Sequence, residues 1–520
     1  MERYKFTQTV AAFALIAFAT AGCSEDRMDA INKRNDNPLD VPAKFLITDV
    51  LTSTAFNTVG GDFSFYASVY MEHETGIYHQ MYHAETRNGE PAAPATYDHM
   101  WSATYVNIKN AKIVIAKCLE EGGADYGNDV TLGVAEVMLA YNAAVLTDLF
   151  GDVPFTEAGE INPDGTPKYM QPRIDRQEDI YRAVFDLLDE AIIHFNGSDA
   201  GVTGALGDRD LIYEGNKRFW RQAAYGLKAR YTMRLLGRSA YPAVDLENII
   251  SYVDHSFTNA AEELKFNHYD GDSNVNPLFG FNYSREALGA SQSLFNKFVA
   301  CKDPRINRYF SDGMKIITDP DEVIPAPNGN PIPSLQGEIY DRSSVTFSLV
   351  APTQLLSYHE LLFLKAEALS RLNHSDAEAA LKEAVMAAFA NLDVSIGASV
   401  NSYFEFFEDY ELGAEAAGNY FDTEVAARFH TAPLQEIMLQ KYLAFAGASG
   451  ESIEAYNDYR RLKYLRENFI SLANSHNATL FPHRFSYGAS DVVANNAVKN
   501  ACGDGSYVYT EPVWWAGGYR

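Results

Sequence analysis

The sequence predicts a mainly α-helical protein, in which tetratricopeptide-like helical hairpins form a scaffold that carries long irregular loops and minor β-structure. Apolar residues recur at three- and four-residue steps along most of the chain, which is typical of helices with one buried face. The predicted helices come in pairs joined by short turns that contain Gly or Asn, and stacked pairs of this kind cover each other's apolar faces. Hydrophobic residues make up 47% of the 520 residues, which is enough for a large core.

The first predicted hairpin shows how the elements begin and end. One helix spans residues 97–119, the Gly-rich segment "EEGGADYGND" follows, and a second helix runs to Phe150. Gly151 can adopt the left-handed conformation that closes a helix, and Pro154 cannot continue one. Further helices are predicted at residues 178–195, 218–236, 354–372, 376–389, 433–445 and 452–465. Long irregular stretches are predicted at residues 266–285, 319–348 and 395–422, and loops of this length and aromatic content are often functional.

The N-terminus has the pattern of a targeting signal. Arg3 and Lys5 precede an apolar run at residues 10–19, and "TAGC" ends at Cys23. This resembles a bacterial lipoprotein signal, in which the cysteine is lipidated, for example with palmitate, and becomes the new N-terminus. A membrane-spanning helix is the alternative, but the run is too short for one. We therefore expect a signal peptide at residues 1–22, a lipidated flexible tether at residues 23–44 with Cys23 as the lipidation site, and a single helical body at residues 45–520.

Charge and cysteine content exclude several classes of protein. The 42 basic and 69 acidic residues give a formal net charge of −27, which disfavours nucleic acid as a partner because its affinity depends largely on cationic side chains. Beyond Cys23 only Cys118, Cys301 and Cys502 occur, far apart and odd in number. They indicate buried or incidental thiols and no disulfide framework.

Aromatic residues provide the candidate ligand site. The chain has 32 Tyr and 31 Phe, and the flat C–H faces of sugar rings pack on aromatic rings while their hydroxyls seek amides, carboxylates and arginines. Two segments combine these groups: "GIYHQMYHAETRNGE", where Tyr78 and Tyr82 are four apart and would share a helical face, and "FNHYDGDSNVNPLFGFNYSRE". Both also fit contact with a partner protein or ordinary packing. The candidate ligand-binding residues are Tyr78, Tyr82, Tyr269, Asn274, Phe279, Phe281, Tyr283 and Arg285.

Other conspicuous side chains have structural interpretations. Trp101 and Trp220 lie on apolar helical stripes and are predicted to be in the core, and the Trp514–Trp515 pair is expected to pack against the body. Arg460 and Arg461 are expected to pair with acidic residues at helix ends.

No metal or cofactor is predicted from the histidines. His73 and His79 are six apart, and His79 and His83 have the zinc-protease spacing without a Glu after the first. "DGDSNVN" from Asp270 alternates oxygen ligands as a calcium loop does, but Val275 and Phe281 stand at the positions of its glycine and closing glutamate. Bound calcium is the one cofactor that this motif leaves open.

Several segments occur in the order expected for one known family. They are the lipoprotein start, the Trp101 helix, "TDLFGDVPFTEA", "FWRQAAYGLKARYTMRL", "CKDPRINRYF", "YHELLFLKAEALSRL", "IMLQKYLAFAGASGESIEAYNDYRRL" and "FPHRFSY". Together they resemble the SusD/RagB family over essentially the whole chain. Two departures are Tyr456, where a tryptophan is common, and residues 489–492, which lack an often-seen glutamate.

The resemblance implies a non-catalytic, SusD-like nutrient-binding lipoprotein. It would be anchored to the outer membrane and, as the acidic "CSEDRMD" after the lipidation site indicates by its similarity to an export tag of Bacteroidetes, would face the outside of the cell. It would capture oligosaccharides and act as the lid of a SusC-like TonB-dependent barrel transporter. Two alternatives are the same architecture with a peptide ligand, as on the RagB side of the family, and a surface glycoside hydrolase, which needs two carboxylates that one sequence cannot identify.

Overall fold

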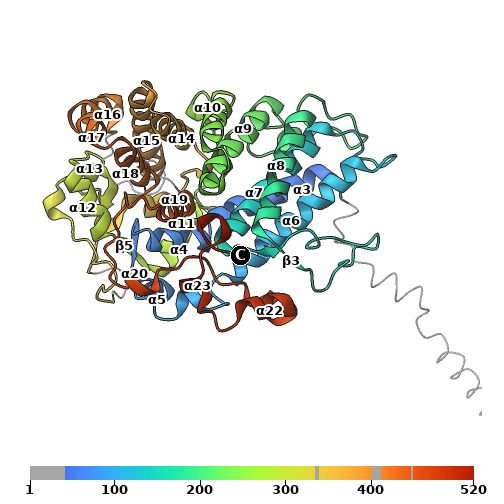
Figure 1. The fold of residues 1–520 in the computed structure, drawn as a ribbon, viewed down its shortest axis with the longest axis horizontal. Helices are drawn as coiled ribbons and strands as arrows, with labels where there is room; N and C mark the ends of the chain where they lie inside the picture. The colour runs from blue at the N-terminus through green and yellow to red at the C-terminus, as the bar shows by residue number, and fades with distance from the viewer. Residues whose placement is uncertain (1–40, 334–338, 401–410, 447–448, 520) are drawn as a thin grey trace, which may run out of the picture. The chain divides into compact units, whose positions relative to one another are not determined.

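Helices form nearly all of the regular structure (Figure 1). The computed structural model describes residues 41–333, 339–400, 411–446 and 449–519, and the chain from Pro42 onward forms one compact unit. The helices are α3 (Ala43–Ser53), α4 (Asp62–Tyr70), α5 (His79–Glu85), α6 (Asp98–Leu119), α7 (Asp129–Phe150), α8 (Gln177–His194), α9 (Lys217–Arg234), α10 (Pro242–Asp254), α11 (Pro277–Arg285), α12 (Gln292–Cys301), α13 (Ile306–Tyr309), α14 (Tyr358–Arg371), α15 (Ala377–Val400), α16 (Gly413–Tyr420), α17 (Ala426–Thr431), α18 (Pro433–Ala446), α19 (Ser452–Tyr464), α20 (Asn477–Leu480), α21 (Ala489–Ala494), α22 (Asn496–Cys502) and α23 (Tyr507–Thr510).

The strands are short and pair only in twos. Within the described ranges, each sheet has two antiparallel strands. The pairs are β1 (Glu74–Gly76) with β5 (Leu288–Ala290), β2 (Val153–Pro154) with β3 (Ile174–Asp175), β4 (Leu264–Phe266) with β8 (Thr353–Leu356), and β6 (Phe310–Ser311) with β7 (Arg342–Ser343). The predicted class, mainly α with minor β content, is confirmed.

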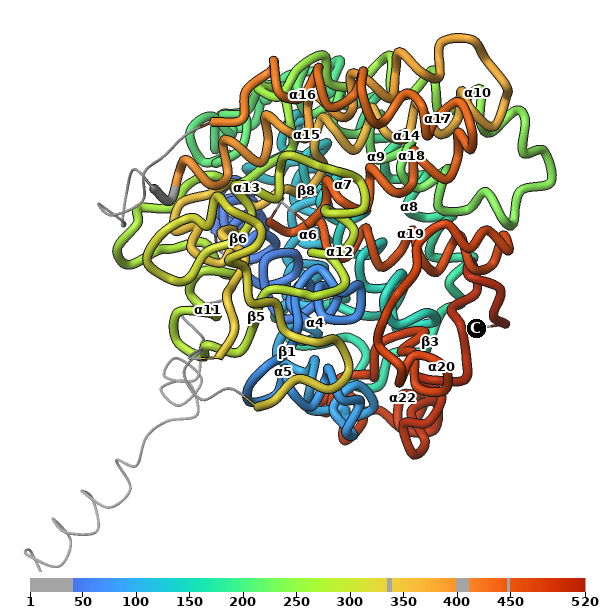
Figure 2. The backbone as a smooth tube through the Cα atoms, turned by 90° about the vertical axis from the view of Figure 1, so that its left-hand side faces the viewer, coloured from blue at the N-terminus to red at the C-terminus, as the bar shows by residue number. Residues whose placement is uncertain are grey.

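The three predicted hairpins are present as α6–α7, α14–α15 and α18–α19, and most of their ends fall within two residues of the predicted ones. Figure 2 shows α14, α15 and α18 packed together, and an apolar cluster that includes Phe363, Leu381 and Ile437 fills the space between them. The free thiols Cys118, Cys301 and Cys502 are buried, as expected.

Helix α7 is the central element of the core. Every residue from Val130 to Phe150 is buried. Among the described helices it is the only one long and apolar enough to cross a membrane, but its complete burial inside the protein identifies it as a core helix. The sequence of α7 explains its burial. Small and apolar residues occur on all sides of the helix, so neighbouring helices can pack against it from every direction.

Gly151 ends α7 as predicted, in a more restrictive conformation than expected. Its φ of 82° and ψ of −130° lie outside the left-handed helical region, in a part of backbone space that is essentially confined to glycine. Its N–H donates to the carbonyl of Thr147 at 2.8 Å and so closes the last turn. Pro154 then enters strand β2.

The structure corrects three predicted boundaries. Residues 353–356 form strand β8, and α14 begins only after Ser357, whose hydroxyl accepts from the N–H of Glu360 at 3.1 Å. Helix α15 continues to Val400, and α16 follows at 413–420, so much of the predicted irregular stretch 395–422 is helical; residues 401–410 lie outside the described part. Helix α11 likewise occupies residues 277–285 of the first predicted loop.

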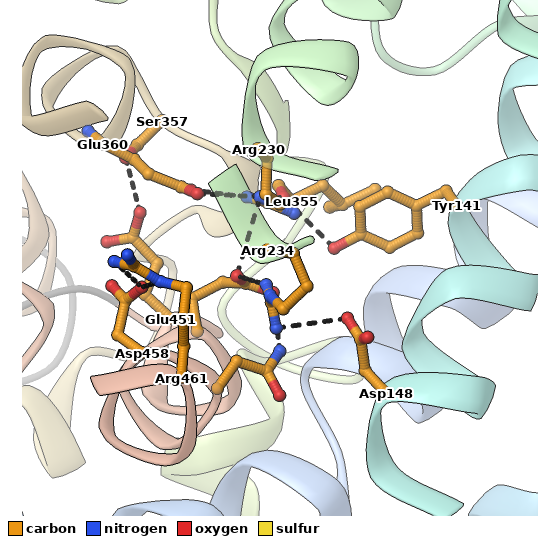
Figure 3. A network of polar contacts seen from close by, with 12 residues as sticks. Tyr141, Asp148, Arg230, Arg234, Leu355, Ser357, Glu360, Glu451, Asp458 and Arg461 are labelled. Carbon is orange, nitrogen blue, oxygen red and sulfur yellow. Dashed lines mark hydrogen bonds and ion pairs between the residues drawn. The ribbon is translucent and has the colours of Figure 1, made fainter. Parts of the chain in front are cut away.

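A buried network of ion pairs connects the hairpins (Figure 3). In α9, Arg230 Nε donates to Glu360 of α14 at 2.7 Å, and Arg234 Nη1 lies 3.2 Å from Asp148 of α7. The same arginine pairs with Glu454 of α19. Lys441 of α18 lies 2.7 Å from Asp458 of α19. The network of ion pairs therefore involves five helices: α7, α9, α14, α18 and α19.

The two adjacent arginines of α19 behave differently. Arg461 makes a bidentate contact with Glu367 at 2.7 and 2.8 Å, as predicted. For Arg460 the prediction was wrong: its guanidinium lies over the rings of Tyr456 and Trp515 and donates to a backbone carbonyl. Trp101, Trp220 and Trp515 are buried, as expected for core residues.

Breaking the buried pair at Arg461 is expected to destabilise the fold strongly. Arg461→Met leaves the Glu367 carboxylate with fewer partners in the interior, and removal of one partner of a buried pair costs about 3 kcal/mol in the free energy of unfolding. Urea denaturation measures this change. Arg182→Met is the control, because Arg182 pairs with Glu178 and Asp179 on the exposed face of α8 and its loss should change the free energy by less than about 1 kcal/mol. Equal effects of the two variants would contradict the role of the network.

Gly151→Ala is expected to lower the free energy of unfolding by about 1–3 kcal/mol, because a Cβ is strained at this positive φ. Gly418→Ala is the matched control. Gly418 lies within α16, where an added Cβ would meet no atom within 4 Å, so the same change should stabilise the protein by about 0.5–1 kcal/mol. A free energy of unfolding that changes in the same direction in both variants would contradict the prediction that the backbone conformation at Gly151 requires glycine.

Candidate functional site

A hollow of about 320 Å³ lies beside α11 and brings predicted and unpredicted residues together. One wall comes from α11 and the residue that follows it, and the other comes from β7 and the adjacent 3₁₀ turn η8 (Ser344–Phe347). The lining residues are Phe279, Asn282, Tyr283, Glu286, Arg342, Thr346 and Phe347. Phe279 and Tyr283 are the two candidate residues from the sequence that line this hollow.

Local sequence explains the start of α11. Pro277 stands in the first helical turn, where its missing N–H is not needed, and the Asn276 side chain accepts from the N–H of Leu278 at 2.9 Å. The Asn276 amide also donates to the carbonyl of Ala351 at 2.9 Å and the hydroxyl of Ser449 at 3.1 Å. A single buried side chain thus caps the helix and fixes it to the scaffold.

Phe279 and Tyr283 form a stacked pair on α11. They are four residues apart, so they lie on one helical face, with ring centroids 5.4 Å apart and an interplanar angle of 15°. Phe279 is buried, whereas Tyr283 is 63% exposed. The inner ring therefore supports the outer one and holds it in place at the rim of the hollow.

An ion pair joins the two walls of the hollow, with Glu286 on the side of the aromatic pair and Arg342 on the other side. Arg342 Nη2 lies 3.7 Å from the Glu286 carboxylate; the Arg342 side chain is 13% exposed and that of Glu286 is 35% exposed. Burial lowers the pKa of Arg342, and the Glu286 charge acts in the opposite direction. Hydrogen bonds from such partly desolvated groups are stronger than in water. The hollow can therefore stack a flat apolar face on Tyr283 and bind hydroxyl groups through Arg342 and Glu286.

The remaining residues of the second predicted segment do not line the hollow. Tyr269 is buried, its hydroxyl is 2.6 Å from that of Thr353, and its ring packs edge-on against Phe56 and Phe266. Phe281 is half-buried and stacks on Phe65 with centroids 4.5 Å apart. Asn274 and Arg285 are exposed but lie outside the hollow.

The segment around Tyr78 and Tyr82 has a different geometry from the predicted one. Helix α5 begins at His79, so Tyr78 precedes it with an extended φ of −150° and the two tyrosines do not share a helical face. The prediction of a shared face was wrong because His79 adopts a left-handed φ of 48° between them. Both tyrosines are half-buried, and neither lines the hollow beside α11.

The calcium-like loop is stabilised by its own hydrogen bonds. The Asp270 carboxylate accepts from the backbone N–H groups of Asn274 at 2.8 Å and Asp272 at 2.9 Å, and from the Asn274 side chain at 2.8 Å. These bonds, that of the Asn274 N–H first, lower the pKa of Asp270 to about 2. Within the described residues, no group of three or more His, Cys, Asp or Glu side chains is arranged to hold a metal ion.

Sequence reasoning missed Glu286, Arg342, Thr346 and Phe347. The last three lie in the long stretch 319–348, which was identified as a loop of functional type without naming residues. Its combination of an arginine, hydroxyl residues and a phenylalanine was the available signal. Cys23, the predicted lipidation site, lies outside the described residues.

Known proteins resemble this chain both in sequence and in fold. A family model described as "Starch-binding associating with outer membrane" matches residues 36–488. The crystal structure of a SusD/RagB family protein from Bacteroides thetaiotaomicron has a TM-score of 0.87 and 46% sequence identity, with coverage of 92% of this chain and 100% of that chain. A search of curated proteins found no match.

More distant structures share the fold. A SusD homologue from Bacteroides fragilis has a TM-score of 0.68 at 18% identity and covers 92% of this chain and 100% of its own. A chitin-binding SusD homologue from Flavobacterium johnsoniae has a TM-score of 0.63 at 18% identity, with coverage of 91% and 98%. The family match over most of the sequence and the 46% identity to a solved member lead to one conclusion. The chain belongs to the SusD/RagB family, whose members bind nutrients in association with the outer membrane.

Proposed function

We propose that this protein is a surface-exposed lipoprotein that captures oligosaccharides at the hollow beside α11 without cleaving them. The observation that carries the proposal is that the stacked Phe279–Tyr283 pair and the Arg342–Glu286 ion pair line one hollow. One relative of similar fold is named as chitin-binding, which supports a glycan as the ligand. Hydrolysis of a glycosidic bond uses two carboxylates, and Glu286 is the one carboxylate among the described residues that line the hollow.

The proposal includes a partner and a place in the cell. A lipid on Cys23 holds the protein on the outer face of the outer membrane, and the body acts as the lid of a SusC-like TonB-dependent barrel transporter that takes up the bound oligosaccharide. The family description, which associates these proteins with the outer membrane, supports the location.

Calorimetric titration with maltose- and chitin-derived oligosaccharides, and with a peptide mixture as the alternative ligand class, tests the site. Tyr283→Ala should weaken oligosaccharide binding by about 1 kcal/mol, or roughly fivefold, because one stacking face is lost. Arg342→Met should weaken it further through loss of a partly buried donor. Tyr241→Ala, which removes a tyrosine 74% exposed at the start of α10, is the control and should leave affinity unchanged.

The outcomes separate the possibilities. If Tyr78→Ala weakens binding and Tyr283→Ala does not, the ligand binds near α5 and the proposed hollow is wrong. Binding of peptides alone would replace the ligand class and keep the receptor function. Release of shorter saccharides during prolonged incubation, followed by chromatography, would contradict the non-catalytic proposal.

Cys23→Ala is expected to move the protein from the membrane fraction to the soluble fraction, because acyl chains on this residue would supply the apolar anchor. Membrane fractionation followed by immunoblotting measures the change. Ser24→Ala is the control and keeps the lipidation site. A Cys23→Ala protein that still sediments with membranes would contradict anchoring through a lipid and indicate attachment through a protein partner.

A further inference from the structure

A second hollow, separate from the one beside α11, is lined by basic side chains. It measures about 160 Å³ and lies where the end of α19 meets the C-terminal segment. Figure 2 places α19 close to the C-terminal end of the chain, and α19 contacts the turn η10 (Trp514–Ala516). The lining residues are Arg460, Lys463, Tyr464, His483, Pro512 and Ala516. Three of them are basic and none is acidic, in a protein with a formal net charge of −27.

Arg460 is buried without a carboxylate against it. It is 2% exposed, its Nη1 donates to the carbonyl of His483 at 3.0 Å, and its Nη2 donates to the side-chain oxygen of Asn457. Its Nε has no acceptor. The guanidinium lies 4.0 Å from the centroid of the Tyr456 ring and 4.8 Å from that of Trp515. All of these contacts are with neutral groups, whereas the neighbouring Arg461 is matched by Glu367.

The electrostatic environment of Arg460 reflects this lack of a contacting anion. Burial is the main reason that its pKa is lowered to about 10. Tyr456 and Asp148 act in the opposite direction, and the charges of Arg234 and Arg484 lower the pKa by smaller amounts. A buried charge that lacks a close counterion is costly, so an anion in the adjacent hollow would be stabilised by it.

The other two basic groups extend the positive region to the surface. Lys463 is exposed, and within the described part of the chain no carboxylate lies within ion-pair distance of its ammonium group. That group lies 5.3 Å from the centroid of the Tyr459 ring and 5.4 Å from that of Phe481. Burial first, and then the charges of Lys463, Arg460 and Arg484, together lower the pKa of His483 to about 4. His483 is therefore neutral at pH 7 and has one ring N–H that can donate.

We propose that this hollow binds a single oxyanion group, a sulfate or a carboxylate, held by Lys463 and His483 and stabilised by the charge of Arg460 beneath it. Its volume of about 160 Å³ exceeds the roughly 30 Å³ that one water occupies in the liquid and admits one such group. Charge-assisted hydrogen bonds to sulfate or carboxylate oxygens are about twice as strong as neutral ones. The oxyanion is either a free inorganic ion or the acidic group of a sugar, and the proposal does not depend on the function of the hollow beside α11.

Calorimetric titration of the full chain with sodium sulfate and with sodium glucuronate, at constant ionic strength set by sodium chloride, tests the proposal. One binding site is expected for at least one of the two. Binding of sulfate would show that a free inorganic anion is enough to occupy the hollow. Binding of glucuronate but not sulfate would show that the ligand is an acidic sugar, with glucose as the neutral control. No binding of either anion above the chloride background overturns the proposal.

Lys463→Gln should weaken that binding about fivefold, which corresponds to loss of one partly exposed ionic contact. Lys315→Gln is the matched control, because Lys315 is an exposed lysine after β6 whose removal changes the net charge equally. Equal weakening in both variants shows a non-specific charge effect and overturns the site. Arg460 is not substituted, since its burial under two rings makes a folding defect the expected result.

The pKa of His483 gives a second readout. An anion beside the ring favours its protonated form, so the bound anion should raise the pKa of His483 above about 4, as followed by histidine NMR titration with and without saturating anion. His430 of α17 is the control, because it is exposed and pairs with Glu378 of α15. Its titration should not change when the anion is added. An unchanged pKa of His483 at saturation shows that the anion binds elsewhere and overturns the assignment.

Discussion

The buried ion pairs between helical hairpins are the constraint on which the rest of the structure depends. Arg230 and Arg234 project from α9 toward carboxylates on α7, α14 and α19, and each of these charges lies in the interior. A charge removed from water is costly unless its partner stands within hydrogen-bond distance. Apolar packing alone would let helices slide by a turn, but these pairs fix the register of α9 against three neighbours (Figure 3).

This fixed frame explains how a short helix can form a binding surface. Helix α11 has nine residues, too few to be stable alone, and Asn276 fixes it by capping its first turn and bonding to Ala351 and Ser449. The Tyr283 ring is supported from below by Phe279. A ring that is already ordered loses little conformational entropy when a ligand stacks on it, so more of the contact energy appears as affinity.

Buried arginines have two different roles in this protein: some are paired with carboxylates and stabilise the fold, and Arg460 has no such partner and lines the proposed anion site. Arg461 and Arg460 are adjacent in sequence, yet the first is matched by Glu367 and the second meets only rings and neutral oxygens. Successive residues of a helix are offset by about 100°, so these two side chains meet different neighbours and their roles differ although their chemistry is the same. The overall negative charge of the chain makes the small basic hollow near Arg460 the exception on which the oxyanion proposal rests.

Periodicity in the sequence determined the helical class, the hairpins and the burial of Trp101 and Trp220, because an apolar stripe is a local property of the chain. The identity of residue 151 also determined the end of α7, since the backbone conformation found there, with φ 82° and ψ −130°, is essentially confined to glycine. The sequence pattern predicts a helix from residue 354, although residues 354–356 belong to a strand, because periodicity over so few residues cannot distinguish the two. Pairing with β4 decided it.

Only the tertiary structure decided which rings are available to a ligand. Tyr269 and Tyr283 are alike in sequence context, but Phe56 and Thr353, from distant segments, enclose the first. The α11 hollow joins Tyr283 to Arg342, which lies 59 residues later and is brought alongside where β7 contacts β5. Local patterns contain no information about such long-range contacts, because the contacts depend on how the whole scaffold packs.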